Sequence, residues 1–388
     1  MRFMPRFVRR SALAAVGALV LSACVPSGLS TLTQRIDPTA PVIVALLVPG
    51  GSGDQGNEVL ASSLENAARL AVADLAGVEI DLRVYSTQGS PAMAAQVARQ
   101  AVDEGARIIL GPLHGAEAAT VGTAVAADGI NVLSFSNNPA IAGNNVFVIG
   151  MTPDNAARRI LTYAARNDRG RVLLVGENTP AGTLVATAVQ RVAPQTGASI
   201  VATQSYDFSQ QGIVTALPAI SQSARSSGAQ ALLFTADSAG ALPILSQLLP
   251  DNRIAPPQFQ FMGITRWDIP AATLQLRGLQ GGWFTMPDPA LTQQFEARYN
   301  SAYGTAPHPI AALAYDGVAA IGALINTGSP DAFSAAMLTQ GSGFVGVNGV
   351  FRLLPDGTNE RGLAVATVRD NTYVILDPAP RSFAGSGS

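Results

Sequence analysis

The sequence predicts an α/β fold, because short apolar segments alternate with segments of helical periodicity along most of the chain. Residues 42–48 (VIVALLV) form a continuous apolar run, and residues 60–76 then carry apolar residues at helical spacing. Such strands, buried on both faces by helices, are typical of parallel sheets. The same alternation restarts at residue 151, so we expect two lobes of similar build.

The remaining elements follow in order. In the first half we expect strands at residues 79–86, 106–113, 130–136 and 145–150, and helices at 91–105 and 115–128. In the second half we expect strands at 171–177, 199–208, 230–237 and 259–265, and helices at 153–167, 215–227 and 241–249. Two further helices are expected at 289–304 and 308–328, and a strand-rich segment follows with a hairpin turn at Asp356-Gly357. Residues 377–388 have the composition of a disordered tail.

The N-terminus predicts export. Four arginines precede an apolar core at residues 11–21, which is too short to remain as a membrane-spanning helix. The core ends in Leu21-Ser22-Ala23-Cys24, which resembles the lipobox of bacterial lipoproteins. This resemblance implies that residues 1–23 are removed, that Cys24 is acylated, and that residues 24–40 form the acylated terminus and a tether. Val25 then favours the periplasmic face of the outer membrane; an ordinary signal peptide is the alternative.

Composition excludes several functions. Without residues 1–23, which carry four Arg and no acid, 20 Arg stand against 26 Asp and Glu, a net charge of −6 that argues against nucleic-acid binding. All cationic side chains other than His are Arg, so no lysine can serve a phosphate loop or a Schiff base. Cys24 is the one cysteine and there are two histidines, too few for a metal site of Cys and His. We therefore expect no enzyme, cofactor or metal.

The glycine pattern Gly51-x-Gly53-x-x-Gly56 after the first strand matches a dinucleotide fingerprint. That fold needs an acid at the end of the second strand to hold the ribose, and residues 84–87 there are Val-Tyr-Ser-Thr. We therefore interpret the glycines as a tight turn between strand and helix.

Taken in order, VALLVP, AVADLAG, GARIILGPLHGAEA and GINVLSFSNNP resemble the leucine-binding branch of type I periplasmic binding proteins, over residues 41–376. The resemblance implies two Rossmann-like lobes with parallel sheets, joined by a three-stranded hinge. The expected hinge crossings lie near Gly150, near Met286 and at residues 344–350. Lobe 1 would then comprise 41–150 and 288–343, and lobe 2 would comprise 151–287 and 344–376.

In that fold the ligand lies beyond the carboxyl ends of the strands, so the candidate site residues are those of the strand-end loops. They are Ser52, Gln55, His114, Ala116, Ser134, Ser136, Asn137, Asn178, Asp237, Thr265 and Trp267. Among them Ser134, Ser136 and Asn137 could hold polar groups, Asp237 or Asp268 could meet a cation, and Trp267 could stack on a ligand. For each, a loop residue satisfied within the protein is the alternative. His308 stands before a proline at a helix start, which favours a structural role.

The resemblance leaves two functions open. One is a receptor that delivers an amino acid, amide or similar small polar solute to an ABC permease. The other is a regulator resembling the penicillin-binding protein activators, whose partner is a peptidoglycan synthase. Amino-acid-binding relatives have hydroxyl residues where this chain has His114-Gly115-Ala116, and an aromatic where it has Ala181. These differences and Val25 favour the activator.

Overall fold

The computed structural model describes residues 35–383. The expected signal peptide, the expected acylation site Cys24 and most of the expected tether lie outside this range, as do residues 384–388. Within it no helix has the length and apolar character needed to cross a membrane. The expected tether ends earlier than residue 40, because Ile36 is 6% exposed in a hydrophobic core and its N–H donates to the Pro330 carbonyl oxygen.

The first lobe is built on a five-stranded parallel sheet in the order β2-β1-β3-β4-β5. Its strands are β1 (Val42–Val48), β2 (Ile80–Ser86), β3 (Ile108–Leu110), β4 (Val132–Ser134) and β5 (Val146–Val148). Alternate residues of β1 enter different cores: Val44 and Leu46 pack in one cluster, Ala45 and Leu47 in another. The central strand is therefore apolar throughout because helices cover both faces.

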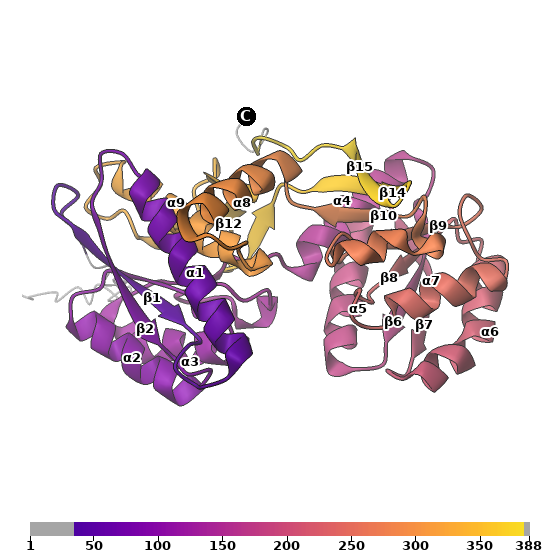
Figure 1. Ribbon diagram of the computed structural model, residues 1–388, viewed down its shortest axis with the longest axis horizontal. Coiled ribbons are helices and arrows are strands. Elements are labelled where there is room, and N and C mark those ends of the chain that lie inside the picture. The colour runs from indigo at the N-terminus through magenta and orange to yellow at the C-terminus, as the bar shows by residue number, and fades with distance from the viewer. Residues whose placement is uncertain (1–34, 384–388) are drawn as a thin grey trace, which may run out of the picture. The chain divides into compact units, whose positions relative to one another are not determined.

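Those covering helices fall into two groups. One core contains residues of α1 (Gln55–Asp74), α8 (Pro289–Tyr303) and α9 (Ala312–Ile325), and the other contains residues of α2 (Pro91–Asp103) and α3 (Gly115–Val125). Figure 1 shows α1 running across β1 beside α9, although the two helices are far apart in sequence. Asp54 begins α1 by accepting a hydrogen bond from the Asn57 N–H.

The second lobe is built on a seven-stranded sheet in the order β15-β14-β10-β9-β8-β6-β7. Its parallel strands are β6 (Arg171–Glu177), β7 (Ser199–Tyr206), β8 (Ala231–Phe234), β9 (Gln260–Gly263) and β10 (Trp283–Met286). Two antiparallel strands, β14 (Ala364–Arg369) and β15 (Thr372–Asp377), extend it beyond β10, and Figure 1 shows them in yellow. Helices α4 (Pro153–Arg166) and α5 (Pro180–Val192) cover one face, and α6 (Gln210–Ser226) and α7 (Leu242–Asp251) the other.

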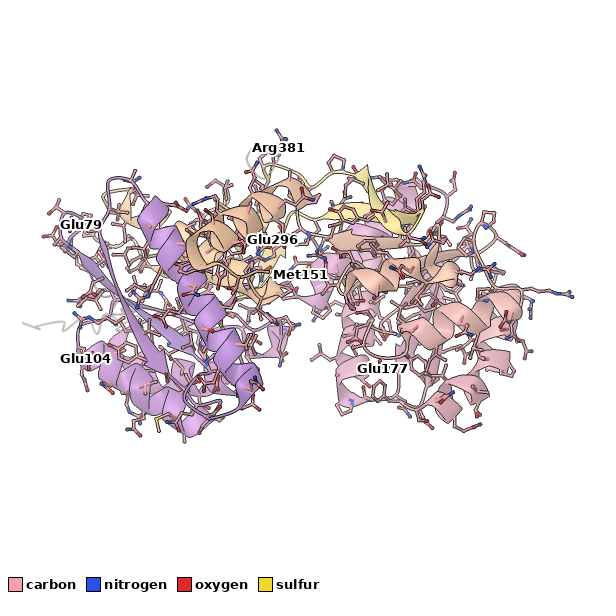
Figure 2. All side chains as sticks on the ribbon, viewed as in Figure 1. Glu79, Glu104, Met151, Glu177, Glu296 and Arg381 are labelled. Atoms are coloured by element: carbon pink, nitrogen blue, oxygen red, sulfur yellow. The ribbon has the colours of Figure 1, made fainter. Side chains whose placement is uncertain are left out.

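Three chain segments connect the lobes. The first runs from β5 to α4 and contains Met151 (Figure 2), and the second runs from β10 to α8. The third follows a small antiparallel sheet of β11 (Phe344–Gly346), β12 (Gly349–Leu353) and β13 (Asn359–Arg361), which comes after the short helix α10 (Ala335–Leu338).

The packing of this small sheet differs from the expected boundary at residue 344. Phe344, Phe351 and Leu353 lie in the core with α1 and α9, whereas Leu363 lies in the core with α4. The chain therefore crosses at residues 362–363. The sequence could not show this, because the apolar residues of β12 and β14 alternate in the same way and only their partners differ.

The expected disordered tail also begins too early. Asp377 ends β15, and the Arg159 guanidinium donates to the carbonyl oxygens of Asp377 and Pro378. Ala379 is 8% exposed in the core of the second lobe. The segment that follows β15 is therefore held against the second lobe by the burial of Ala379 and by the hydrogen bonds from Arg159.

Candidate functional site

A candidate site that receives residues from both lobes is a cavity of about 800 Å³ at the carboxyl ends of β3, β4 and β9. Residues from both lobes and from the connecting segments line it. Its volume is within the 300–1,000 Å³ that is usual for small-molecule sites. The lining residues are Leu60, Leu113, His114, Gly115, Ala116, Phe135, Ser136, Asn137, Asn138, Gly150, Met151, Arg266, Ile269, Pro287, His308, Pro309, Ile310, Leu313, Asn348, Arg361 and Leu363.

Four of the residues singled out in the sequence line this cavity: His114, Ala116, Ser136 and Asn137. They come from the loops that follow β3 and β4, as expected for an open parallel sheet. His114 is the N-cap residue of α3, but its side chain makes no capping hydrogen bond. The first amides of α3 therefore have no side-chain acceptor and remain open to a ligand.

Ser134 does not face this cavity. It is fully buried, its hydroxyl donates to the Pro112 carbonyl oxygen at 3.0 Å, and it accepts from the Ser136 N–H at 3.1 Å. Ser134 thus ties together the two loops that do line the cavity. Ser52 and Gln55 are exposed in the glycine loop and at the start of α1, and neither lines the cavity.

Trp267 was expected to stack on a ligand, and that expectation is wrong. The indole is fully buried in the core of the second lobe and stacks on Phe284, with ring centroids 5.7 Å apart. The backbone makes room for it: a Cβ added at Gly263 would lie 2.3 Å from the indole nitrogen. An aromatic side chain in a strand-end loop can point into the core or toward the cavity. Trp267 points into the core, where the absence of a side chain at Gly263 leaves space for the indole.

The other candidates of the second lobe lie outside the cavity lining. Asn178 donates to Asp207, Asp237 accepts from the Gly240 N–H at 2.6 Å, and the Thr265 hydroxyl donates to the Ala236 carbonyl oxygen. Asp268 instead forms an ion pair with Arg266.

Glu177, at the end of β6 (Figure 2), lies close to Asp237. A Cβ added at Gly240 would lie 3.0 Å from Asp237 Oδ1 and 3.5 Å from Glu177 Oε1, so the two carboxylates face the same small space. Burial raises the pKa of the Glu177 carboxyl, and the charge of Asp237 raises it further.

The cavity lining also contains two arginines, Arg266 and Arg361, which were not among the candidates from the sequence. Arg361 is buried: its Nη1 donates to Asp316 Oδ2 at 3.0 Å and its Nε to the Ile149 carbonyl oxygen at 3.0 Å. Arg266 pairs with Asp268 in its own loop and is 23% exposed. Arg266 lies between the candidates Thr265 and Trp267 in a strand-end loop, so its position carried a sequence signal. Arg361 lies in a strand-rich segment without such a signal, and only the fold identifies it.

Arg361 belongs to a buried polar network between the first and third connecting segments. The Asn155 side-chain amide donates to Asn359 Oδ1 at 2.8 Å, and the Asn359 amide donates to the carbonyl oxygens of Val148 and Gly150. The Arg361 N–H donates to Asn155 Oδ1. Because each partner is buried and bonded, removing one would leave the others unsatisfied.

His308 has both a structural and a lining position. Its Nδ1 accepts from the Ile310 N–H at 3.2 Å, which caps the turn before α9, and its side chain lines the cavity. Burial lowers the pKa of this imidazole.

The glycine loop does not resemble a phosphate site. Gly51 and Gly53 have φ of 82° and 77°, the left-handed region that glycine adopts freely, and this permits the tight turn into α1. The Gly51 N–H donates to Glu58 Oε1 at 2.7 Å. The Glu58 carboxylate therefore already occupies the Gly51 amide to which a phosphate would bind. Among residues 35–383 no three His, Cys, Asp or Glu side chains are grouped to hold a metal ion.

A family model described as periplasmic binding protein matches residues 41–372. This chain belongs to that family. The family consists of binding proteins and not enzymes, and it acts in the periplasm.

Solved structures of similar fold include three from ABC transport systems. A branched-chain amino acid ABC transporter periplasmic ligand-binding protein from Burkholderia xenovorans is 16% identical, with a TM-score of 0.70 over 89% of this chain and 97% of that one. An ABC transporter substrate-binding protein from Desulfitobacterium hafniense, in complex with Leu, is 17% identical with a TM-score of 0.64 over 87% and 100%. A solute-binding protein of R. palustris in complex with benzoate is 17% identical with a TM-score of 0.59 over 89% and 98%.

Among curated proteins, uncharacterized protein RP748 of Rickettsia prowazekii is 24% identical over 259 residues, which are 61% of this chain and 67% of that protein. At these identities the solved structures establish the two-lobed fold, and the ligand must be inferred from the cavity itself.

Proposed function

We propose that this periplasmic binding protein is a solute receptor that delivers a small organic molecule to an ABC permease. The observation that carries the proposal is the cavity of about 800 Å³, because it is lined from both lobes, is largely apolar, and contains a few polar groups at strand ends. These are the features of a ligand site in an α/β protein. The similar structures from ABC transport systems support the same function.

This proposal reverses the preference for a penicillin-binding protein activator. That preference depended on Val25 and on the changed contacts at His114-Gly115-Ala116 and Ala181, which put a free amino acid as ligand in doubt. The cavity instead offers the Ser136 hydroxyl, the open amides of α3 and the guanidinium of Arg266. The loss of one set of contacts is thus matched by another set in the same place.

The first test is thermal unfolding of the purified full-length chain against amino acids, amides, carboxylates and peptidoglycan fragments. A ligand at 100 times its Kd adds about 2.7 kcal/mol, which raises Tm by a few degrees. Uptake of any ligand found would then be compared in cells with and without the protein. Binding without a change in uptake would argue against delivery to a permease.

The activator remains the second candidate, on the observation that Val25 follows Cys24 in a lipobox-like sequence. An outer-membrane anchor would separate the chain from a permease of the inner membrane. If no solute raises Tm and a peptidoglycan synthase co-purifies with the chain, this second function replaces the first.

A further inference from the structure

We propose that the ligand of this cavity is a small organic carboxylate with an apolar body and no ammonium group, and that Arg266 binds its carboxylate. This inference rests on the proposed receptor function and names its substrate class.

The described residues that line the cavity include two guanidinium groups and two imidazoles, but no Asp or Glu. A ligand ammonium group buried there would have no carboxylate to pair with, and burying an unpaired charge is costly. The carboxylates of Glu177 and Asp237, at the edge of the second sheet, are outside the lining. The cavity therefore favours an anion over a zwitterion.

The two guanidinium groups differ in what they have left to donate. Arg361 uses its Nε, Nη1 and Nη2 on Ile149 and Asp316. Arg266 donates from Nε and Nη2 to the two oxygens of Asp268, at 2.6 Å and 2.5 Å, and its Nη1 has no hydrogen-bond partner among the described residues. Asp268 itself does not line the cavity. Arg266 thus combines a fixed guanidinium plane with a free donor.

A second set of hydrogen-bond donors in the cavity lining is the N-terminus of α3. Gly115 and Ala116 begin α3, an 11-residue helix whose N-cap side chain makes no hydrogen bond. The acid of this first turn, Glu117, is buried, accepts from the Thr87 hydroxyl at 2.9 Å, and is outside the lining. Both the amides and Arg266 therefore present donors and no acceptor, which suits a carboxylate.

The rest of the lining suits an apolar body. Leu60, Leu113, Phe135, Ile269 and Leu313 contribute side chains that can contact a branched aliphatic or an aromatic group. Contact with apolar side chains contributes affinity but does not select between these shapes. The charge of the ligand, and not the shape of its body, is the property that the lining specifies.

The experiment compares leucine with two compounds that each lack one of its charged groups: 4-methylpentanoate, which lacks the ammonium, and 3-methylbutylamine, which lacks the carboxylate. Titration calorimetry on the full-length chain is repeated with phenylacetate, phenylglycine and benzylamine. We expect each carboxylate to bind at least about tenfold more tightly than its amino acid, since the extra ammonium must be buried unpaired. The amines should not bind measurably.

The variant Arg266→Gln/Asp268→Asn removes both charges of the pair and so avoids leaving Asp268 buried and unpaired. It should weaken carboxylate binding about 10- to 100-fold, the usual worth of a hydrogen bond to a charged group. Arg166→Gln removes one positive charge from the exposed end of α4 and should leave binding unchanged. An unchanged Kd in the double variant, with the fold intact by circular dichroism, would overturn the role of Arg266.

The outcomes separate this inference from the receptor function. Tighter binding of leucine than of 4-methylpentanoate would overturn the substrate class, keep the receptor function, and point to Glu177 and Asp237 as the ammonium partners. If neither carboxylate binds but another compound of the wider solute panel does, the substrate class is overturned and the receptor function is kept. Failure of the whole panel would overturn both.

Discussion

Arg361 and Arg266 line the same cavity, but the protein holds them in opposite ways. Arg361 is 3% exposed and joins three separate parts of the chain: β13, the β5 end at Ile149, and α9 at Asp316. Arg266 is 23% exposed and, among residues 35–383, pairs only with Asp268, two residues along its own loop. Two arginines of one cavity therefore differ in how firmly the fold holds them, and this difference is why we propose Arg266, and not Arg361, as the ligand contact.

The reason for the difference is the surroundings of each guanidinium. Asn348 also donates to Asp316, and the Arg361 guanidinium lies over the Phe351 ring, 4.8 Å from its centroid. A charge so enclosed requires its partners, because water cannot replace them. Arg266 remains within reach of solvent, so a ligand can displace water from it.

The largest expected effect is from Arg361→Gln, which leaves Asp316 buried and uncompensated. We expect the free energy of unfolding to fall by about 3–5 kcal/mol. Urea unfolding followed by circular dichroism measures this, and the double variant Arg361→Gln/Asp316→Asn should recover part of the loss. A loss below about 1 kcal/mol would mean that the network contributes little to stability.

The next prediction tests whether Trp267, in the loop at residues 264–270, contributes to the stability of the core or to ligand binding. Trp267→Ala empties a fully buried site and should cost about 3–5 kcal/mol, and Trp267→Phe less. Because Trp267 does not line the cavity, Trp267→Phe should leave the Kd of any ligand within about twofold. A tenfold change in the Kd of Trp267→Phe, with little loss of stability, would instead support stacking of Trp267 on the ligand.

Arg266→Gln/Asp268→Asn is the contrast to the Arg361 variant. With one partner in its own loop, the pair should contribute no more than about 1 kcal/mol to stability. Urea unfolding at low and high salt checks this. If the double variant unfolds as readily as Arg361→Gln, the two arginines do not differ in the way described.

The smallest effect is a pH dependence from His308. Because burial lowers the pKa of this imidazole, the native state resists the proton that the unfolded state accepts below about pH 6.5. Stability should therefore be complete above that pH and should fall as the pH decreases, by at most about 1.4 kcal/mol per pH unit.

His308→Asn is the matched variant, since Asn keeps an acceptor for the Ile310 N–H without titrating. It should show a shallower loss of stability between pH 7 and pH 5 than the native chain. Identical slopes in the two chains would assign the pH dependence to other groups.

Part of the cavity lining could be located from the sequence, because parallel strands bring their carboxyl ends to one edge. His114, Ala116, Ser136 and Asn137 follow two such strands and do line the cavity. Ser134 also lies at the carboxyl end of a strand but does not line the cavity, because its hydroxyl points toward the Pro112 carbonyl oxygen. Position along a strand is set by periodicity, but the direction of the last side chain depends on the neighbouring loop.

The sequence by itself determined the α/β alternation, the two sheets and the edge at which ligand contacts would lie, since apolar periodicity is local and needs only a few neighbouring residues. Only the tertiary structure decided that Trp267 enters the core, that β11 to β13 pack with the first lobe, and that Arg266 and Arg361 reach one cavity. Each of those depends on residues distant along the chain. Spacing in sequence carries no record of which distant residues come to share a surface.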